Sequence, residues 1–373
     1  MYFNKHGIYN EFGRILKENV DVPILLAGRM DDPEMANTAI GDCCDMVGYG
    51  RPLLADPYLP RKLATDKEEE IRPCLGCHLG CSGRVALGMH PSCAVNPQAG
   101  REMNYRLHTT DEPKTVLIAG GGVAGMEAAL VLKQRGHHPI LVEKSGKLGG
   151  VLNVAAVPDF KKDERRLIQW FERELEARKV DVRMNTEVTP ELARKVGADV
   201  IITAVGAKPV DLALPGNGSI MSIEKAMELP EAQKIVVIGG GLVGCETALW
   251  LAQNGKEVTL VEKNADLMTG ESGDVPIANK AMLMDLVKAN QVKIMTGTQV
   301  RQVDQDAIVV HRGGEEASIP ADAVVQAAGF VSCKELYYEL RELNVPVFNI
   351  GDSRAFHNVM QAVWDAFEIA ISI

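Results

Sequence analysis

The stretch that decides the fold is VLIAGGGVAG, residues 116–125. An apolar strand runs directly into the pattern G-x-G-x-x-G on Gly120, Gly122 and Gly125, an apolar helix follows, and Glu143 closes the next apolar strand. In this context the glycines let the backbone approach a pyrophosphate, the helix N-terminus offers N–H donors, and the glutamate accepts a hydrogen bond from a ribose hydroxyl. The sequence therefore predicts a Rossmann-like dinucleotide-binding unit.

The same order of elements begins again 119 residues later. Gly239, Gly241 and Gly244 lie between an apolar strand and a helix, and Glu262 follows at the spacing of the first unit. A carboxylate at this position favours a free 2′-hydroxyl and repels a 2′-phosphate, so NAD(H) is expected in preference to NADP(H), although Lys263 is adjacent. The chain thus carries an internal duplication of a nucleotide-binding unit.

Two further glycine signals indicate that the second unit is inserted into the first. The sequences TAVG at 203–206 and AAG at 327–329 each follow an apolar strand. Such strand ends are expected where the chain leaves one parallel sheet and later returns to it. We therefore expect an outer domain formed by 113–207 and 325–373 and an inner domain formed by 208–324.

The last predicted strand, at 347–350, indicates which nucleotide the outer domain binds. Gly351 and Asp352 follow this strand and precede a helix that is expected to begin near Asn358. An aspartate there can accept hydrogen bonds from a ribityl chain while the helix N-terminus faces the negative end of a flavin, and a simple helix cap is the alternative. We therefore expect FAD in the outer domain and a nicotinamide nucleotide in the inner one. The predicted FAD residues are Gly120, Gly122, Gly125, Glu143, Gly150 of the LGG sequence at 148–150, Gly351 and Asp352.

Four of the 8 cysteines lie within 20 residues and form the pattern C-x2-C-x3-C-x11-C, on Cys74, Cys77, Cys81 and Cys93. Four thiolates on a glycine-broken loop suit a cubane 4Fe-4S cluster, and a structural zinc site is the alternative. Zinc usually takes two separated C-x2-C pairs, which favours the cluster. No C-x4-C follows the first glycine motif, so dithiol chemistry is not expected, and Cys43, Cys44 and Cys245 are interpreted as packing residues.

The first 65 residues have the order strand, helix, strand, which is typical of a βα unit followed by the start of another. Gly28-Arg29 and Gly50-Arg51 come at the ends of the two strands. Exposed backbone N–H groups and a guanidinium at such a position suit a phosphate, and an ordinary turn is the alternative.

Composition excludes several classes of protein. Apolar residues make up 46% and charged residues 24%, which argues against disorder and coiled coil. A formal net charge of -10, from 40 basic and 50 acidic residues, argues against a nucleic-acid partner, because phosphate neutralisation needs clustered Lys and Arg. No apolar run approaches the roughly 18 residues of a membrane span, and the N-terminus does not resemble a signal peptide. A cytoplasmic protein is therefore expected.

The cysteine spacing followed by two glycine motifs resembles the 2,4-dienoyl-CoA reductase and trimethylamine dehydrogenase family, the multidomain NADH:flavin oxidoreductases of the old yellow enzyme group. The resemblance covers essentially the whole chain. It implies an FMN-binding TIM barrel, then a 4Fe-4S cluster, then FAD and NAD(P) domains. The segment from ILLAGRM at 24–30 to GRPLLADPYLP at 50–60 is similar to the seventh and eighth barrel strands, which implies FMN-phosphate contacts at Gly28, Arg29, Gly50 and Arg51.

The chain departs from that family in lacking about three hundred N-terminal residues, which include the first six barrel strands and the acid that protonates the substrate. The expected architecture is therefore α/β, with a remnant of a TIM barrel that contains its last two βα units, an iron–sulfur loop and two nested Rossmann-like domains. The catalytic residues are expected in the missing barrel, and FMN is expected only where the barrel is completed. The expected boundaries are 1–65 for the remnant and 66–112 for the cluster loop. Either the chain is a truncated or split gene product, or a separate polypeptide supplies the rest. The bare sheet edge makes self-association plausible.

The function expected from these features is electron transfer from NAD(P)H through FAD and the cluster to FMN and an enoate or enoyl-type substrate. One alternative is an electron-transfer subunit similar to the small subunit of glutamate synthase, which also joins a Cys-rich segment to FAD and NAD domains. Another is a truncated fragment without catalytic activity that acts in assembly. The substrate itself is not encoded in these residues.

Overall fold

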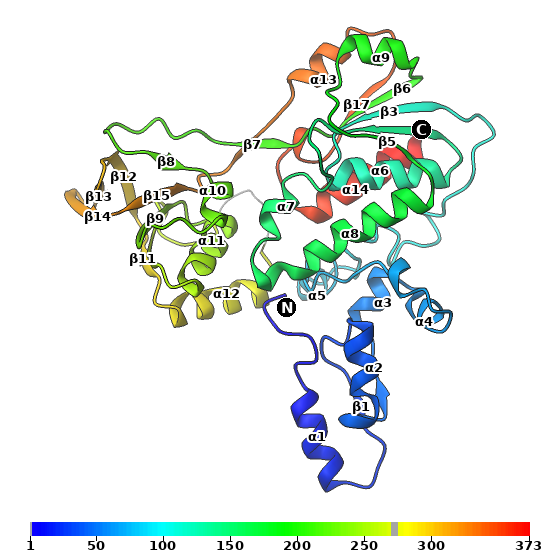
Figure 1. Cartoon of the computed structure of the whole chain (residues 1–373), viewed down its shortest axis with the longest axis horizontal. Coiled ribbons are helices and arrows are strands. Elements are labelled where there is room, and N and C mark those ends of the chain that lie inside the picture. The colour runs from blue at the N-terminus through cyan, green and yellow to red at the C-terminus, as the bar shows by residue number, and fades with distance from the viewer. Residues whose placement is uncertain (1, 270–274) are drawn as a thin grey trace. The chain divides into compact units, whose positions relative to one another are not determined.

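The computed structural model describes residues 2–269 and 275–373, and its contacts divide the chain into two compact units (Figure 1). The first unit contains the residues up to Gly206 together with Lys334–Ile373, and the second contains Ala207–Cys333. The second unit therefore interrupts the first in sequence.

A five-stranded parallel sheet forms the centre of the first unit, in the order β17-β6-β3-β4-β5. Strand β3 forms because its apolar side chains are buried on both faces of the sheet, with Val116 and Ile118 in one core and Leu117 and Ala119 in the other. Full burial of side chains of this size contributes about 1.5–3 kcal/mol each. The strands are β3 (Thr115–Ala119), β4 (His138–Val142), β5 (Asp181–Arg183), β6 (Val200–Thr203) and β17 (Val347–Asn349).

Helices cover both faces of this sheet. On one face, α6 packs against α8 and α14, and all three contribute to the larger core. On the other face, α9 and α13 contribute to the second core. The helices of this domain are α6 (Val123–Gln134), α7 (Leu152–Ala155), α8 (Lys162–Ala177), α9 (Pro190–Val196), α13 (Glu335–Leu340) and α14 (Val359–Ser372), with short 3-10 turns η2 (Asp159–Lys161) and η3 (Gly351–Ser353).

The second unit repeats this design. Its parallel sheet has the order β11-β10-β9-β15-β8, in which β9 and β10 hold the places of β3 and β4. A three-stranded antiparallel sheet, β12-β13-β14, and the two-stranded ribbon β7-β16 complete it. The structure groups residues 325–333 with this unit, because β16 pairs with β7.

The strands of the second unit are β7 (Ala207–Pro209), β8 (Ile220–Met221), β9 (Lys234–Ile238), β10 (Glu257–Val261), β11 (Lys293–Met295), β12 (Thr298–Val303), β13 (Ala307–Arg312), β14 (Glu315–Pro320), β15 (Ala323–Gln326) and β16 (Phe330–Ser332). Its helices are α10 (Ile223–Met227), α11 (Leu242–Gln253) and α12 (Ile277–Ala289).

The N-terminal segment, drawn in blue in Figure 1, belongs to the first unit and contains two short parallel strands that pair with each other. Each strand has only two residues, fewer than the apolar runs of the sequence, because on the described part of the chain each has a single strand neighbour. The elements are α1 (Asn10–Asn19), β1 (Leu25–Leu26), α2 (Pro33–Asp42), β2 (Met46–Val47), α3 (Arg51–Ala55) and α4 (Leu59–Leu63). The predicted barrel origin of this segment stays a prediction.

The segment that carries the four clustered cysteines is mostly irregular and includes only η1 (Glu68–Glu70) and α5 (Ser82–Ala86). Among the residues that the structure describes, none of the helices combines the length and the apolar character that a membrane crossing requires.

Candidate functional site

In the first glycine loop, one glycine has no room for a side chain and another borders open space. A Cβ on Gly125 would lie 1.9 Å from the carbonyl oxygen of Gly120, so only glycine lets helix α6 approach the end of β3 this closely. Gly120 itself has φ +108°, a conformation that other residues rarely adopt. At Gly122 a Cβ would meet nothing within 4 Å, so this backbone borders open space. An open loop at a helix N-terminus fits a dinucleotide pyrophosphate.

The second glycine loop has the same geometry. A Cβ on Gly244 would lie 1.9 Å from the carbonyl oxygen of Gly239, whose φ is +111°. Gly241 has open space around its Cβ position, as Gly122 does. The structure therefore contains two equivalent cradles, one in each unit.

A nearly buried glutamate lies beside each cradle and is held by backbone donors. Glu143 accepts hydrogen bonds of 2.7 Å from the N–H of Gly121 and of 2.7 Å from the N–H of Ser145. Glu262 accepts from Gly240 at 2.6 Å and from Asn264 at 2.7 Å. Both side chains thereby fix the glycine loop, and their predicted hydrogen bond to a ribose hydroxyl stays a prediction.

The other residues predicted for FAD lie against the first cradle. A Cβ on Gly150 would lie 3.1 Å from the Cα of Gly122, and a Cβ on Gly351 would lie 2.9 Å from the Cβ of Ala124 on α6. Both glycines have positive φ, +54° and +61°. Segments more than two hundred residues apart are thus brought to one loop.

Asp352 follows in η3, and burial raises the pKa of its carboxyl above the ordinary value. It accepts a 3.2 Å hydrogen bond from the N–H of His357. The N-cap of α14 is Asn358, whose side chain accepts from the N–H of Gln361 at 3.1 Å. Asp352 is therefore not the capping residue of that helix, which was the alternative role that the sequence left open.

The side chain that fixes η3 in place is Ser353, which no sequence motif marks. Ser353 is fully buried, and its hydroxyl lies 2.6 Å from the side-chain oxygen of Asn349 and 3.2 Å from the carbonyl oxygen of Thr203. Thr203 ends β6 and Asn349 ends β17, so this hydrogen-bond network joins the two strand ends that present Asp352. A serine after Gly-Asp carries no distinctive sequence signal, which is why only the structure reveals it.

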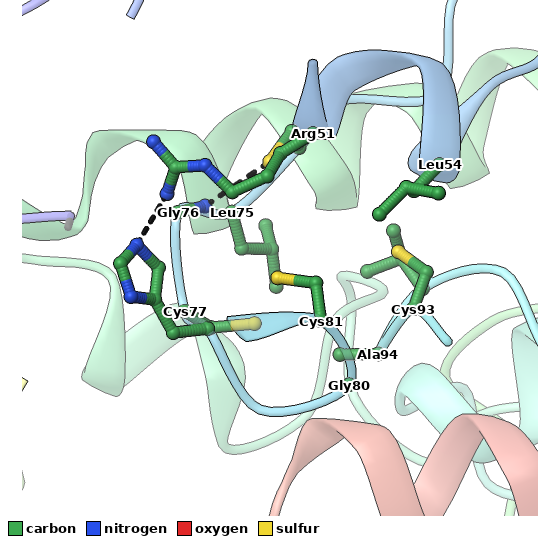
Figure 2. Close-up of a pocket in the computed structure, with 12 residues that line it drawn as sticks. Arg51, Leu54, Leu75, Gly76, Cys77, Gly80, Cys81, Cys93 and Ala94 are labelled. Atoms are coloured by element: carbon green, nitrogen blue, oxygen red, sulfur yellow. Dashed lines mark hydrogen bonds between the residues drawn. The ribbon is translucent and has the colours of Figure 1, made fainter. Parts of the chain in front are cut away.

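The four clustered cysteines line one cavity together with Leu54 and Arg51 (Figure 2). All four are half-buried and free of disulfides: Cys74, Cys77, Cys81 and Cys93. Burial raises the pKa of the Cys74 thiol to about 12 and also raises the pKa values of Cys77 and Cys93. Thiols held protonated in this way need a metal to displace their protons, and four sulfur donors around one cavity fit either an iron–sulfur cluster or zinc.

The cavity depends on a close approach between two parts of the cysteine loop. A Cβ on Gly80 would lie 2.8 Å from the backbone of Cys93, and the N–H of Ser92 donates to the carbonyl oxygen of Gly80 at 2.6 Å. Glycine next to the third cysteine is therefore required to bring the distant fourth cysteine to the other three.

The two predicted phosphate-binding arginines have partners within the chain. Arg29 is buried and forms an ion pair with Asp163 of α8, and it lies 3.8 Å from a carboxylate oxygen of Asp31. Arg51 lies 2.5 Å from Nε2 of His78 in the cysteine loop. Burial and the charges of Arg51 and Arg29 lower the pKa of His78 to about 4. Both guanidinium groups therefore have partners within the chain. The predicted phosphate contacts stay a prediction for Gly28, Arg29, Gly50 and Arg51.

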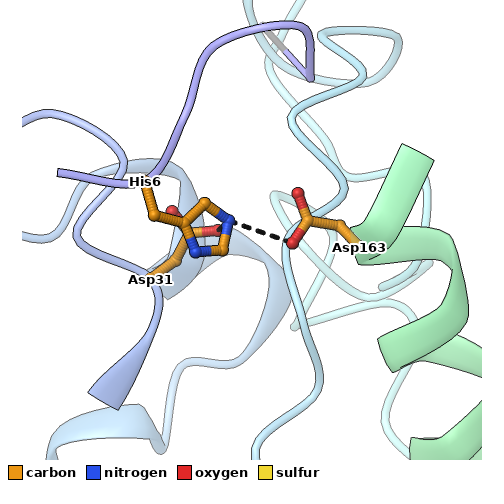
Figure 3. A group of neighbouring side chains, drawn as sticks. All are labelled: His6, Asp31 and Asp163. Carbon is orange, nitrogen blue, oxygen red and sulfur yellow. Dashed lines mark hydrogen bonds and ion pairs between the residues drawn. The ribbon is translucent and has the colours of Figure 1, made fainter. Parts of the chain in front are cut away.

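The group around Arg29 includes His6, Asp31 and Asp163, whose potential ligand atoms lie within 4.8 Å of one another (Figure 3). Nε2 of His6 lies 3.1 Å from a carboxylate oxygen of Asp163. These residue types can hold a metal ion, but the guanidinium of Arg29 already lies beside the same two carboxylates and supplies the compensating positive charge. We interpret this group as an ion-pair network that joins the N-terminal segment to α8.

The predicted packing cysteines are buried. Cys43 and Cys44 have 0% exposure and follow α2, and Cys43 is the C-cap of that helix. Cys245 is also 0% exposed, and its thiol lies 3.5 Å from the carbonyl oxygen of Gly240.

Two glycine cradles with paired glutamates, each at the end of a parallel sheet, define the class of a dinucleotide-binding oxidoreductase with two nested nucleotide domains. Three family comparisons agree with this class. Residues 189–354 match the pyridine nucleotide-disulphide oxidoreductase family, residues 115–213 match the FAD dependent oxidoreductase family, and residues 2–70 match the NADH:flavin oxidoreductase / NADH oxidase family.

Individual relatives match along nearly the whole chain. A cinnamate reductase of Clostridium sporogenes is 44% identical over 375 aligned residues, which cover 100% of this chain and 56% of the relative. An NADH oxidase of Thermoanaerobacter brockii is 33% identical and is covered to 56%, with 96% of this chain aligned. A solved 2-naphthoyl-CoA reductase complex superposes with a TM-score of 0.92 at 27% identity, covering 100% of this chain and 57% of that one.

Over nearly its whole length the chain is similar to NADH oxidase and enoate-type reductases of the kind that its motifs predicted. These matches also confirm the predicted α/β oxidoreductase fold and support flavin and pyridine nucleotide as cofactors. The chain spans a little over half the length of the curated relatives that it matches.

Proposed function

We propose that the chain delivers electrons from NADH, through FAD and a 4Fe-4S cluster, to an FMN-containing barrel that reduces an activated C=C bond. The observation that carries the proposal is the cavity lined by four cysteines in a chain that also has two dinucleotide cradles. When bound, FAD would accept a hydride from NADH and release its two electrons, and the cluster would carry them one at a time.

The residues of this chain have separate roles in the proposal. In the second cradle, Gly239, Gly241 and Gly244 would leave room for the pyrophosphate of NADH, and Glu262 would hold its ribose. Because the carboxylate of Glu262 is fixed by two backbone donors, it would repel a 2′-phosphate, which favours NADH over NADPH. The first cradle, with Glu143, Gly150, Gly351 and Asp352, would hold FAD in the same manner, and Cys74, Cys77, Cys81 and Cys93 would ligate the cluster.

The substrate class comes from the relatives. A cinnamate reductase and a 2-naphthoyl-CoA reductase are named for conjugated acids or thioesters, which suggests an enoate or enoyl-type substrate for the whole protein. The match of residues 2–70 to the NADH:flavin oxidoreductase family favours this function over a glutamate synthase-like electron-transfer subunit.

A barrel partner fits the exposed apolar surface of the N-terminal segment. Phe12 and Ile15 on α1 are 62% and 51% exposed, and Leu25 on β1 is 60% exposed. Apolar side chains beside an unpaired strand edge are expected to bind further barrel strands, whether these come from the same polypeptide, from a second one or from another copy.

The test is anaerobic reconstitution with FAD, iron and sulfide, followed by metal and flavin analysis and by NADH addition. We expect about four irons per chain, consistent with a cubane cluster, and bleaching of the flavin band by NADH. Cys81→Ser is expected to lose the iron and to retain FAD. Cys333→Ser is the matched control, because Cys333 is also a half-buried free cysteine but lies outside the loop. Zinc without iron, or iron content that is insensitive to Cys81→Ser, would contradict the cluster assignment.

A further inference from the structure

Trp364 lies on α14 and hydrogen-bonds to the backbone of the fourth clustered cysteine. Its indole N–H donates to the carbonyl oxygen of Cys93 at 3.0 Å. Helix α14 follows the predicted FAD segment of Gly351 and Asp352, so this one side chain connects the FAD-binding helix to the cysteine loop. Both residues also pack at the border of the larger hydrophobic core.

Two arginines from the segment around the clustered cysteines lie over the same indole ring. The guanidinium carbon of Arg101 lies 3.9 Å from the ring centroid of Trp364, and that of Arg84 lies 5.9 Å from it. Arg101 is fixed in turn by Tyr105, whose hydroxyl oxygen lies 3.1 Å from it and donates to Glu368 of α14 at 3.1 Å. The orientation of the indole is thus set by groups that precede and follow Cys93.

The position of the Cys93 carbonyl affects how the thiol is presented. Backbone N–H groups of Val95 and Asn96 hydrogen-bond to the sulfur of Cys93. Those two N–H groups belong to peptides just after the carbonyl that Trp364 holds. Holding that carbonyl therefore restricts the backbone from which the two donors project. Groups that orient a ligand in this way govern metal affinity and redox potential.

We infer that Trp364 is a positioning residue for Cys93, which fixes the fourth ligand of the proposed cluster from the FAD-binding helix. This inference rests on the cluster assignment made above. A role as an electron carrier is disfavoured, because two guanidinium cations over the ring stabilise its electrons and make their removal harder.

The test compares two tryptophan substitutions in the full chain reconstituted with FAD and iron. Trp364→Phe removes the N–H and keeps a ring for Arg101. Trp170→Phe is the matched control, because its indole N–H also donates to a carbonyl at 3.0 Å, that of Glu70, and it also lies beneath an arginine, Arg72, at 4.5 Å. The readouts are the anaerobic rate of iron extraction by a ferrous chelator and the midpoint potential of the cluster, measured by electron paramagnetic resonance.

We expect Trp364→Phe to release iron about tenfold faster than the wild-type chain. Its midpoint potential should shift downward, because N–H donors to sulfur stabilise the reduced cluster. FAD content should stay unchanged, and Trp170→Phe should match the wild type in both readouts. Arg101→Met, which keeps the indole but loosens it, should shift both readouts in the same direction by less, and it serves where Trp364→Phe does not fold.

Unchanged iron release and potential in Trp364→Phe would overturn the inference, and so would equal changes in Trp170→Phe, which would indicate general destabilisation. A wild-type chain that takes up no iron would instead overturn the proposed function, and this inference with it. The iron content of the wild type therefore distinguishes the two failures.

Discussion

At the scale of single residues, each glycine loop contains one glycine that the fold requires and another that we expect a ligand to require. Gly125 lies so close to the carbonyl oxygen of Gly120 that there is no room for a Cβ atom. Gly122 instead faces open space and has φ -74°, which any residue can adopt. The same contrast holds for Gly244 and Gly241 in the second unit, where Gly241 has φ -68°. Stability and binding should therefore respond differently to the two positions.

We predict that Gly122→Ala folds normally and binds FAD at least about tenfold more weakly, because the added methyl group occupies the space of the pyrophosphate. The free energy of unfolding of the FAD-free chain should be unchanged or higher by about 0.4–1 kcal/mol, since alanine restricts the unfolded chain. The measurements are FAD retention on gel filtration and urea denaturation of the FAD-free protein.

The control for this prediction is Gly241→Ala, which should weaken NADH and leave FAD content unchanged. Gly125→Ala should instead prevent correct folding of the first cradle. Full FAD retention in Gly122→Ala would show that the open space beside this glycine is not the pyrophosphate site.

At the level of elements, helix α8 is joined to the N-terminal segment by buried charges. Asp163 lies in the first turn of this helix with only 2% exposure and pairs with Arg29, and its carboxylate also lies 3.1 Å from Nε2 of His6. Burial opposes ionisation of Asp163, but the hydrogen bond from His6 and the charge of Arg29 prevail and lower its pKa. Removing one member of such a group leaves a buried charge without compensation.

We predict that Asp163→Asn lowers the free energy of unfolding by about 3 kcal/mol at neutral pH. Because the pKa of Asp163 is lowered in the folded state, its contribution is present above the ordinary aspartate pKa of about 3.9 and is lost as the pH falls below it. The difference between variant and wild type should therefore shrink in acid. Urea denaturation followed by tryptophan fluorescence measures this in a Trp250→Phe background, which restricts the signal to the unit that contains Asp163.

Asp42→Asn is the control, because Asp42 pairs with Arg14 at the surface, where both side chains are about half exposed. Solvent screens such a pair, so no resolvable change in stability is expected. Equal effects of the two substitutions would refute the assignment of the Arg29 network as a buried, stabilising one.

The sequence predicted those features of the elements that depend on short-range patterns. Each glycine loop follows one strand and is separated from its glutamate by one helix and a second strand, and this regular order makes both cradles recognisable in the sequence. The pairing of Arg29 with Asp163 spans 134 residues, and the contact of Trp364 with Cys93 spans 271. Such pairs depend on how elements pack, and one sequence contains no signal for them.

At the level of the whole molecule, duplication and insertion explain the order of the domains. The sheets β17-β6-β3-β4-β5 and β8-β15-β9-β10-β11 have matching central strands, and the second lies within the sequence of the first. The sequence predicted the duplication from its repeated glycine motif and the insertion from the strand ends TAVG at 203–206 and AAG at 327–329. It did not predict the antiparallel ribbon β7-β16, because three-residue strands that pair across more than one hundred intervening residues leave no periodic pattern.

That ribbon leads to a prediction about independent folding of the inserted unit. Ala207 pairs with Ser332 and Pro209 pairs with Phe330, so the two ends of the unit are adjacent. A domain whose ends lie side by side can be excised without breaking its own chain connections, which favours independent folding. We predict that residues 207–333 fold alone with a cooperative thermal transition and bind NADH.

Glu262→Ala in this fragment should weaken NADH binding about tenfold, which is the effect of losing one hydrogen bond to a charged group. Circular dichroism measures folding, and titration measures NADH binding. A fragment that folds but does not bind NADH would refute the assignment of the second cradle.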